Sequence, residues 1–493
     1  MPTFFESLGS RESGFPKLEG LALSIPLQRI GVFGVIFASL LSGPTFSSMG
    51  GEAEMLEVIR KLEQRIDHLE KRIADGEPPQ TLSQSPATSV SQSPLPVLPS
   101  SGPAVDLSSK KSSGFSIGDR VPVKFKGFLK VDGLYTAGGV NSTDAPRFAV
   151  PHNDRVGFGD SFTGTIQHSR LAAAWEGVTL AGGEANALIE VDALNLNDLS
   201  DSSKFINNQT RMRLLYVSLK YTDWELLFGE AWDVFSPRNP KSLNTNGNLW
   251  FTGNAGFRRP QFRASRTFRI DEKQALDIVG SVNANVGVSQ FSVDTDGDGV
   301  AERISQKSGE DSGVPVIQGA VKYSFAADSE RARKFELGFS GVYGVEEVDA
   351  RGTFGPYRDV DQWGMGVDFS IPLVSRLSLA GEWHIGENTD AFFMGGGITP
   401  AGEGVQSMGG WAQLVYDATS KIKIRLTYGW EDVDRSDLGI GGREKNQVFG
   451  AQSIYRLSSA IDIGLEYDHF TTDYLGTANA EADMVWSSMI FSF

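Results

Sequence analysis

The chain has 493 residues, of which 40% are hydrophobic, and a formal charge of −16. Only one segment, near the N-terminus, is a candidate for a long apolar run, which excludes a bundle of transmembrane helices. The absence of cysteine excludes disulfides and thiolate chemistry, and the acidic balance argues against a general affinity for nucleic acid.

The first 48 residues have the order of a secretory signal. Arg29 precedes the 12 apolar residues IGVFGVIFASLL, and a segment of small residues, 42–48, follows them. An apolar run of this length is too short to span a bilayer, which takes about 20 residues. We therefore predict that residues 1–48 are a signal peptide.

Residues 52–75 show the heptad pattern of a short coiled coil. Apolar residues recur at alternating spacings of four and three, with Ile at a and Leu at d: Met55, Ile59, Leu62, Ile66, Leu69 and Ile73. So short a helix is marginal unless it self-associates. The seam alone favours two strands, whereas a barrel attached to it could impose three.

Residues 76–114 are rich in Pro, Ser, Gln and Thr, and prolines interrupt every candidate helix or strand. This composition is typical of an extended, largely disordered linker. We can argue for no independent function of this segment.

From residue 115 to the end the hydrophobic period changes to two. In the segment KFKGFLKVDGLY, residues 124–135, one face carries Phe125, Leu129, Val131 and Tyr135, and the other carries Lys124, Lys126, Lys130 and Asp132. On a membrane strand, an apolar face beside a charged face indicates lipid outside and water inside. We therefore predict an all-β transmembrane barrel over residues 115–493.

Counting such segments gives about 16 antiparallel strands. They begin near Lys124, Thr163, Gly183, Thr210, Trp224, Pro260, Gln274, Val314, Lys334, Asp361, Leu377, Met408, Lys421, Asn446, Ala460 and Glu481. Short and long connections alternate, as expected of periplasmic turns and extracellular loops. An even count places both ends of the barrel, and hence the coiled coil, in the periplasm.

The last strand alternates too, with Val485, Met489, Phe491 and Phe493 on one face. A terminal Phe on such a strand resembles the C-terminal recognition signal of outer-membrane barrels. The alternative is an edge strand of a soluble β-sandwich. A barrel of about 16 strands leaves an aqueous channel, so its size alone implies a pore.

The connection after the fifth strand, residues 236–256, is rich in Asn and Gly and contains Arg238, Asn244, Asn246 and Asn248. General porins fold the loop at this position into the barrel as a constriction, and the resemblance implies the same role here. The alternative is an ordinary surface loop.

Positive charge is dense around this loop. The candidates for a pore lining that selects anions are Lys130, Arg170, Arg211, Arg213, Arg258, Arg259, Arg263 and Arg269. Rings of Arg or Lys favour anions in pores, and a guanidinium binds carboxylate with two hydrogen bonds. The alternative is that these arginines only balance inward Asp and Glu. Arg266 lies on the apolar face, where we expect a subunit interface.

Along this region the sequence resembles the DcaP-like outer-membrane porins. The segments that carry the resemblance are FKGFLKVDGLY (125–135), QHSRL (167–171), RMRLLYVSL (211–219), FGEAWDVF (228–235) and RRPQFR (258–263). The resemblance implies a homotrimer in the bacterial outer membrane that passes small anionic solutes such as dicarboxylates. That family also places a short coiled coil between signal and barrel.

The segment DTDGDGVAE, residues 294–302, has the spacing of a calcium loop. Asp294, Asp296, Asp298 and Glu302 occupy positions 1, 3, 5 and 9, but Ser305 stands where the bidentate Glu is required. We keep two interpretations, a Ca²⁺ site in an extracellular loop and a solvated acidic loop. No other cofactor is indicated.

An enzyme and a structural protein are the two alternatives to a channel. An enzyme would need a clustered nucleophile and base, and the five histidines are scattered without a local motif. A structural protein that tethers the envelope through its coiled-coil stalk is the main alternative. The sequence favours a passive porin, bound to outer-membrane lipid and with no nucleic-acid partner.

Overall fold

The computed structural model describes residues 114–116, 122–151, 160–180, 182–194, 210–245, 249–287, 290–293, 302–328, 333–349, 357–397 and 404–493. The predicted signal peptide and coiled coil lie outside these residues, as does the predicted linker except for Gly114. Among the described residues, no helix is long and apolar enough to cross a membrane.

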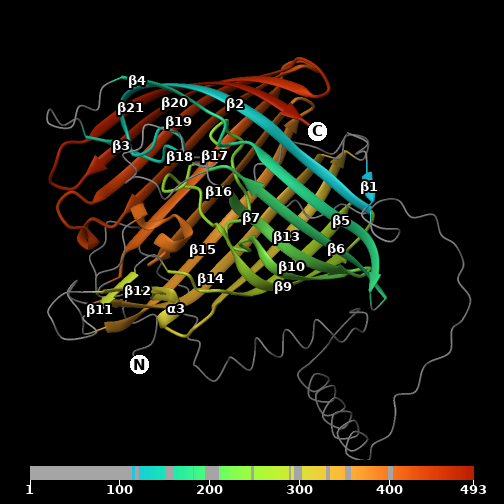
Figure 1. The fold of residues 1–493 in the computed structure, drawn as a ribbon, viewed down its shortest axis with the longest axis horizontal. Coiled ribbons are helices and arrows are strands. Elements are labelled where there is room, and N and C mark those ends of the chain that lie inside the picture. Colours follow the sequence, from blue (N-terminus) through green and yellow to red (C-terminus); the bar gives the residue numbers. More distant parts are fainter. Residues whose placement is uncertain are drawn as a thin grey trace, which may run out of the picture. The chain divides into compact units, whose positions relative to one another are not determined.

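Within the described residues, 16 antiparallel strands form a closed barrel (Figure 1). They are β2 (Pro122–Val140), β5 (Arg170–Leu180), β6 (Gly183–Asp192), β7 (Arg211–Lys220), β8 (Trp224–Trp232), β9 (Arg258–Arg269), β10 (Gln274–Asn283), β13 (Val316–Asp328), β14 (Arg333–Asp349), β15 (Tyr357–Val374), β16 (Leu377–Glu387), β17 (Gln406–Asp417), β18 (Ile422–Val433), β19 (Arg443–Arg456), β20 (Ile461–Tyr474) and β21 (Ala480–Ser492). The predicted fold class is confirmed.

Each barrel strand pairs with the next one along the chain, and β21 returns to β2 to close the ring. This closing register runs from Phe128 opposite Ser492 to Gly138 opposite Ala482. The Gly127 N–H also donates to the Phe493 carbonyl at 3.2 Å. The barrel therefore begins and ends at the rim that carries the short turns, as the even strand count predicted.

Short elements complete the described fold. They are β1 (Gly114–Ser116), β3 (Ala149–Val150), β4 (Ser161–Thr165), β11 (Gln290–Val293), β12 (Glu302–Lys307), α3 (Ser308–Asp311), and the 3₁₀ helices η3 (Asp390–Phe392), η4 (Gly395–Gly397) and η5 (Arg435–Asp437). β11 and β12 pair with each other as a separate hairpin.

The second barrel strand was predicted to begin near Thr163, and the structure divides it. β4 and β5 both pair with β2, β4 with residues 132–136 and β5 with residues 123–128. At the break, the Ser169 hydroxyl accepts the Lys130 N–H at 2.9 Å and donates to the Lys130 carbonyl at 3.2 Å. A side chain thus replaces one step of the backbone ladder, and the backbone groups of Lys130 stay satisfied.

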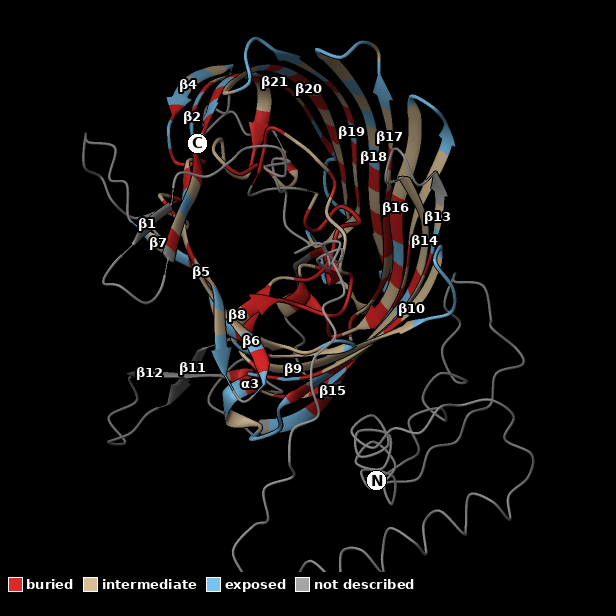
Figure 2. Ribbon diagram, turned by 90° about the vertical axis from the view of Figure 1, so that its right-hand side faces the viewer, coloured by how far each residue is buried: buried red, intermediate tan, exposed pale blue. Residues whose placement is uncertain are grey.

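The two faces of the strands differ as the alternation predicted. On β2, Leu129 and Val131 are 51% and 58% exposed, whereas Lys130 and Asp132 are 0% and 2% exposed. Exposed apolar side chains occur on strands all round the barrel. Figure 2 shows buried segments along the strands and in loops that lie within the ring. An apolar exterior around a polar interior is the pattern of a barrel that sits in lipid.

Candidate functional site: the interior of the barrel

The connection between β8 and β9, residues 233–257, lies inside the barrel, and we call it the inner loop. Near its start, the Phe235 N–H donates to Gln318 Oε1 of β13 at 2.9 Å. Further along, the Leu243 N–H donates to Glu466 Oε2 of β20 at 2.7 Å. Because both acceptors are buried on strands far round the ring, the inner loop lies along the inner wall and not on the outer surface.

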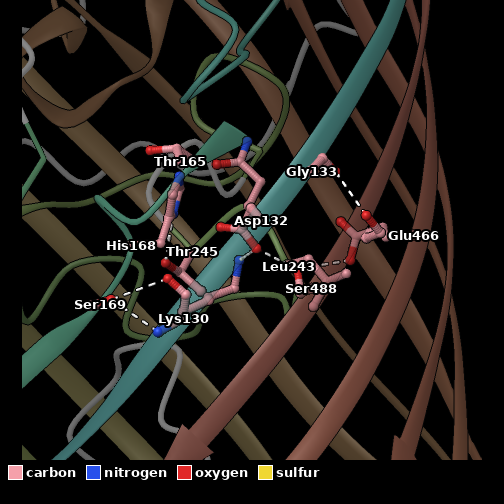
Figure 3. A network of polar contacts seen from close by, with 12 residues as sticks. Lys130, Asp132, Gly133, Thr165, His168, Ser169, Leu243, Thr245, Glu466 and Ser488 are labelled. Carbon is pink, nitrogen blue, oxygen red and sulfur yellow. Dashed lines mark hydrogen bonds and ion pairs between the residues drawn. The ribbon is translucent and has the colours of Figure 1, made fainter. Parts of the chain in front are cut away.

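The tip of the inner loop docks at a polar network carried by β2, by the segment between β4 and β5, and by β20 and β21 (Figure 3). The Thr245 hydroxyl lies 3.0 Å from His168 Nδ1, and its carbonyl accepts Arg170 Nη2 at 2.9 Å. Lys130 forms a fully buried ion pair with Asp132 beside this contact. Lys130 therefore points inward as predicted, but it is fully buried and its charge is paired with Asp132.

Three carboxylates on alternate strands hold the inner loops by accepting backbone N–H groups. Glu382 of β16 accepts the Arg238 N–H and, at 2.6 Å, the Ser236 hydroxyl. Glu466 of β20 accepts the Leu243 N–H. Glu431 of β18 accepts the Gly396 N–H at 3.2 Å, from a second inward segment between β16 and β17. We call these three residues the carboxylate row; each is at most 3% exposed.

The charge of Arg238 in the inner loop is paired with carboxylates of two barrel strands. Its Nη2 lies 2.7 Å from Glu336 Oε2 of β14, and its Nε donates to Asp368 of β15. All three side chains are mostly buried. Two carboxylates that share one guanidinium leave little of its field for a solute, so Arg238 fixes the loop to the wall.

Four of the predicted arginines meet on the opposite side of the barrel. They are Arg170 of β5, Arg211 and Arg213 of β7, and Arg258 of β9. The first three lie close enough to Arg258 to repel its charge. We call these four residues the basic wall. Arg211 Nη2 and Arg213 Nη1 both bind Asp192, at 2.7 and 2.9 Å.

A β-bulge explains why Arg211 and Arg213 point inward. Leu215, which shares their odd parity, is 47% exposed on the outer face. The β6–β7 register shifts between Glu190 and Val191, opposite Arg213, so that Arg213 and its neighbour Leu214 are both buried. The extra residue reverses the alternation at this point.

The basic wall holds more positive than negative charge. Its contacting carboxylates among the described residues are Glu190 and Asp192. The Arg258 guanidinium lies 4.4 Å from the Phe257 ring centroid, and its Nε and Nη1 have no hydrogen-bond partner in the described structure. The same is true of Arg170 Nε. Donors left unfilled in a low-dielectric site favour an incoming anion.

The remaining predicted arginines of β9 do not join the basic wall. Arg259 forms a 2.7 Å ion pair with Asp233 at the start of the inner loop. Arg263 donates to Gln261 Oε1 at 2.9 Å and to the Trp232 carbonyl. Arg269 is exposed at the end of β9, beside the short turn that follows it.

The other predicted residues are placed only in part. Asn244 Nδ2 donates to the Pro146 carbonyl at 3.1 Å and so holds the inner loop to the connection after β2. Asn246 and Asn248 lie outside the described residues, as do Asp294, Asp296 and Asp298, while Glu302 is described only as the first residue of β12. The calcium loop therefore stays a prediction.

Several interior residues were not among those predicted from the sequence. The carboxylate row could have been found, since Glu382, Glu431 and Glu466 alternate with outward apolar or aromatic residues on their strands. Arg147, in the connection after β2, and Arg443, at the start of β19, carried no signal. A loop has no period, and neither residue belongs to a motif.

No protein-family model matches the chain, and no curated protein does either. Among solved structures, the outer-membrane channel DcaP of Acinetobacter baumannii is similar with a TM-score of 0.54 and 18% identity, over 77% of this chain and 99% of that one. An anion-selective porin from Comamonas acidovorans aligns with a TM-score of 0.45 and 11% identity, over 76% of this chain and 100% of that one. OprB of Pseudomonas putida aligns with a TM-score of 0.46 and 11% identity, over 75% and 94%. The chain therefore has the fold of the DcaP channel, a closed 16-strand antiparallel barrel.

Proposed function

We propose that this protein is an outer-membrane porin through which small hydrophilic solutes, preferentially anions, diffuse passively. The apolar outer face of the strands supports a position in a lipid bilayer. A ring of 16 strands is wide enough to leave an aqueous channel beside the loops that lie within it.

The observation that carries the preference for anions is the basic wall. Four guanidiniums share two carboxylates there, and donors of Arg170 and Arg258 have no partner among the described residues. On the opposite side, the carboxylate row is occupied by N–H groups of the inner loops. The charge left for a passing solute is therefore positive, which favours anions in a narrow pore.

Two finer points belong to the same proposal. Guanidiniums bind carboxylates with parallel hydrogen bonds, so that small carboxylates, including dicarboxylates such as succinate, are the expected solutes. The resemblance of the sequence to the DcaP-like porins implies a homotrimer, which we include in the proposal. Three equal conductance steps per insertion are the signature expected of it.

The test is the reversal potential of the purified protein in planar bilayers under a KCl gradient. We expect a reversal potential on the anion side. Arg258→Gln should move it toward zero, because it removes a positive charge of the basic wall that forms no ion pair among the described residues. Arg269→Gln is the matched control, since that residue lies exposed at the short-turn rim, and it should leave the potential unchanged. A silent or cation-selective wild-type protein would refute the proposal.

A further inference from the structure

The connection after β2, residues 141–150, lies inside the barrel and holds Arg147 in place. The Arg147 carbonyl accepts Thr252 Oγ1 of the inner loop at 3.0 Å and Asn446 Nδ2 of β19 at 2.8 Å. Its N–H donates to Asn141 Oδ1 at 2.8 Å. Three contacts from three elements thus fix the backbone of this one residue.

The guanidinium of Arg147, in contrast, has no ionic partner. It lies over two rings, 5.3 Å from the centroid of Phe393 and 5.7 Å from that of Phe251. Within the described part of the chain, its Nε is buried without an acceptor and no carboxylate binds it. Stacking on aromatic faces orients the planar fork but leaves its in-plane donors unused.

Arg443 of β19 repeats this arrangement next to it. Its guanidinium lies 4.0 Å from the ring centroid of Phe148, the residue that follows Arg147. It donates to the Gly396 carbonyl, and its Nε has no partner in the described structure. Glu431 is the carboxylate near it, but Glu431 already accepts the Gly396 N–H.

The charges of these two arginines repel each other. Burial, followed by the charges of Arg211 and Arg443, lowers the pKa of Arg147 to about 10, which leaves it protonated at neutral pH. Two like charges in a partly buried site are a standing electrostatic penalty, and an anion placed between them would remove it.

We propose that Arg147 and Arg443 form an anion-binding position, separate from the basic wall, that takes a carboxylate group of a permeating solute. The position rests on the proposed porin function and gives it a second point of contact. Arg211 of the basic wall is close enough to Arg147 for the two positive charges to repel each other.

The experiment measures the block of KCl current through the full protein by succinate. Arg147→Gln should raise the dissociation constant for block about tenfold, since a charge-assisted hydrogen bond to carboxylate is worth roughly that factor. Arg147→Lys keeps the charge and loses the planar guanidinium. Its dissociation constant for block should therefore lie between those of the wild type and Arg147→Gln. Arg435→Gln is the control, because its side chain is 70% exposed on the outside of η5, and it should match the wild type.

A second variant separates the loss of an anion contact from misfolding of the connection that carries Arg147. Arg443 belongs to a different element, and Arg443→Gln should raise the dissociation constant for block by the same factor. If the two arginines share one carboxylate, the double variant should have a dissociation constant no higher than that of either single variant. Unchanged block in Arg147→Gln or in Arg443→Gln would overturn the proposal. If Arg258→Gln still lowered anion selectivity in that case, the porin function would stand without it.

Discussion

The two sides of the barrel interior use charge in opposite ways. On β14 to β20, four buried carboxylates bind groups of the inner loop: Glu336 and Asp368 bind Arg238, and Glu382 and Glu466 accept backbone N–H groups. On β5 to β9, the guanidiniums outnumber their carboxylates, and Arg258 keeps buried donors without a partner among the described residues. The acidic side holds the loop, and the basic side is the part of the interior that we propose for solute binding.

This difference shows that the sign of a pore cannot be read from formal charge. The chain carries −16 overall, and its inward strands carry many carboxylates. These carboxylates bind groups of the loop that they anchor, so the electric field in the lumen depends on which charges stay unpaired.

The largest expected effect comes from removing the charge that joins loop and acidic side. Arg238→Met leaves the mostly buried Asp368 without its partner and Glu336 with only Lys322 at 4.0 Å, which should lower the free energy of unfolding by about 3 kcal/mol. Urea titration in lipid vesicles measures it. Arg435→Met is the control, because its exposed contact with Glu444 at 3.7 Å should contribute under about 1 kcal/mol. Equal losses in both variants would break the comparison.

A glycine in the inner loop tests how closely loop and wall approach. Gly253 has φ +95°, and a Cβ there would lie 2.0 Å from the Gly410 carbonyl oxygen of β17. Gly253→Ala should therefore combine backbone strain of about 1–3 kcal/mol with displacement of the loop, visible as a larger conductance. Gly441→Ala isolates the strain, because Gly441 has φ +83° with open space around it. An unchanged conductance in Gly253→Ala would show that the loop does not narrow the lumen.

A smaller effect is expected within the carboxylate row. Glu382→Gln keeps one acceptor for Ser236 or the Arg238 N–H but loses the charge, which should lower the free energy of unfolding by about 1–2 kcal/mol. Its reversal potential should match the wild type, since the carboxylate is buried behind the loop. A shift toward stronger anion selectivity would mean that Glu382 acts on the lumen after all.

The smallest stability effect should come from the basic side. Arg258→Gln removes a buried charge with unfilled donors together with its contacts to the rings of Trp232 and Phe257. The free energy of unfolding should therefore fall by about 1 kcal/mol or less, even though selectivity falls. The same urea titration measures it. A loss as large as that of Arg238→Met would assign Arg258 to structure and leave the anion preference without its main support.

The barrel was predictable because its signals are local. Period-two alternation marks each strand, and the lengths of the connections give the strand count and the rim at which the chain begins and ends. The position of the inner loop followed from its place after the fifth strand, by resemblance to general porins. Even the break at Ser169 altered only the start of one strand.

The charge pairing was not predictable, because the partners are distant in sequence. Arg238 and its partner Asp368 are 130 residues apart, and nothing local distinguishes this arginine from Arg258. Lys130 alternates as a lumen residue would, yet it is fully buried and paired with Asp132. The bulge at Arg213 reverses the alternation that a pattern assumes. The roles proposed for these residues in permeation stay predictions.

The path of the inner loop also determines the order in which the molecule is assembled. Its contacts with Glu382 and Glu466 span 144 and 224 residues, and the acceptors belong to strands that follow it in the chain. Contacts of such separation form late, because the intervening chain must be ordered first. We therefore expect the loop to dock after the C-terminal strands have paired, so that the lumen narrows late in folding.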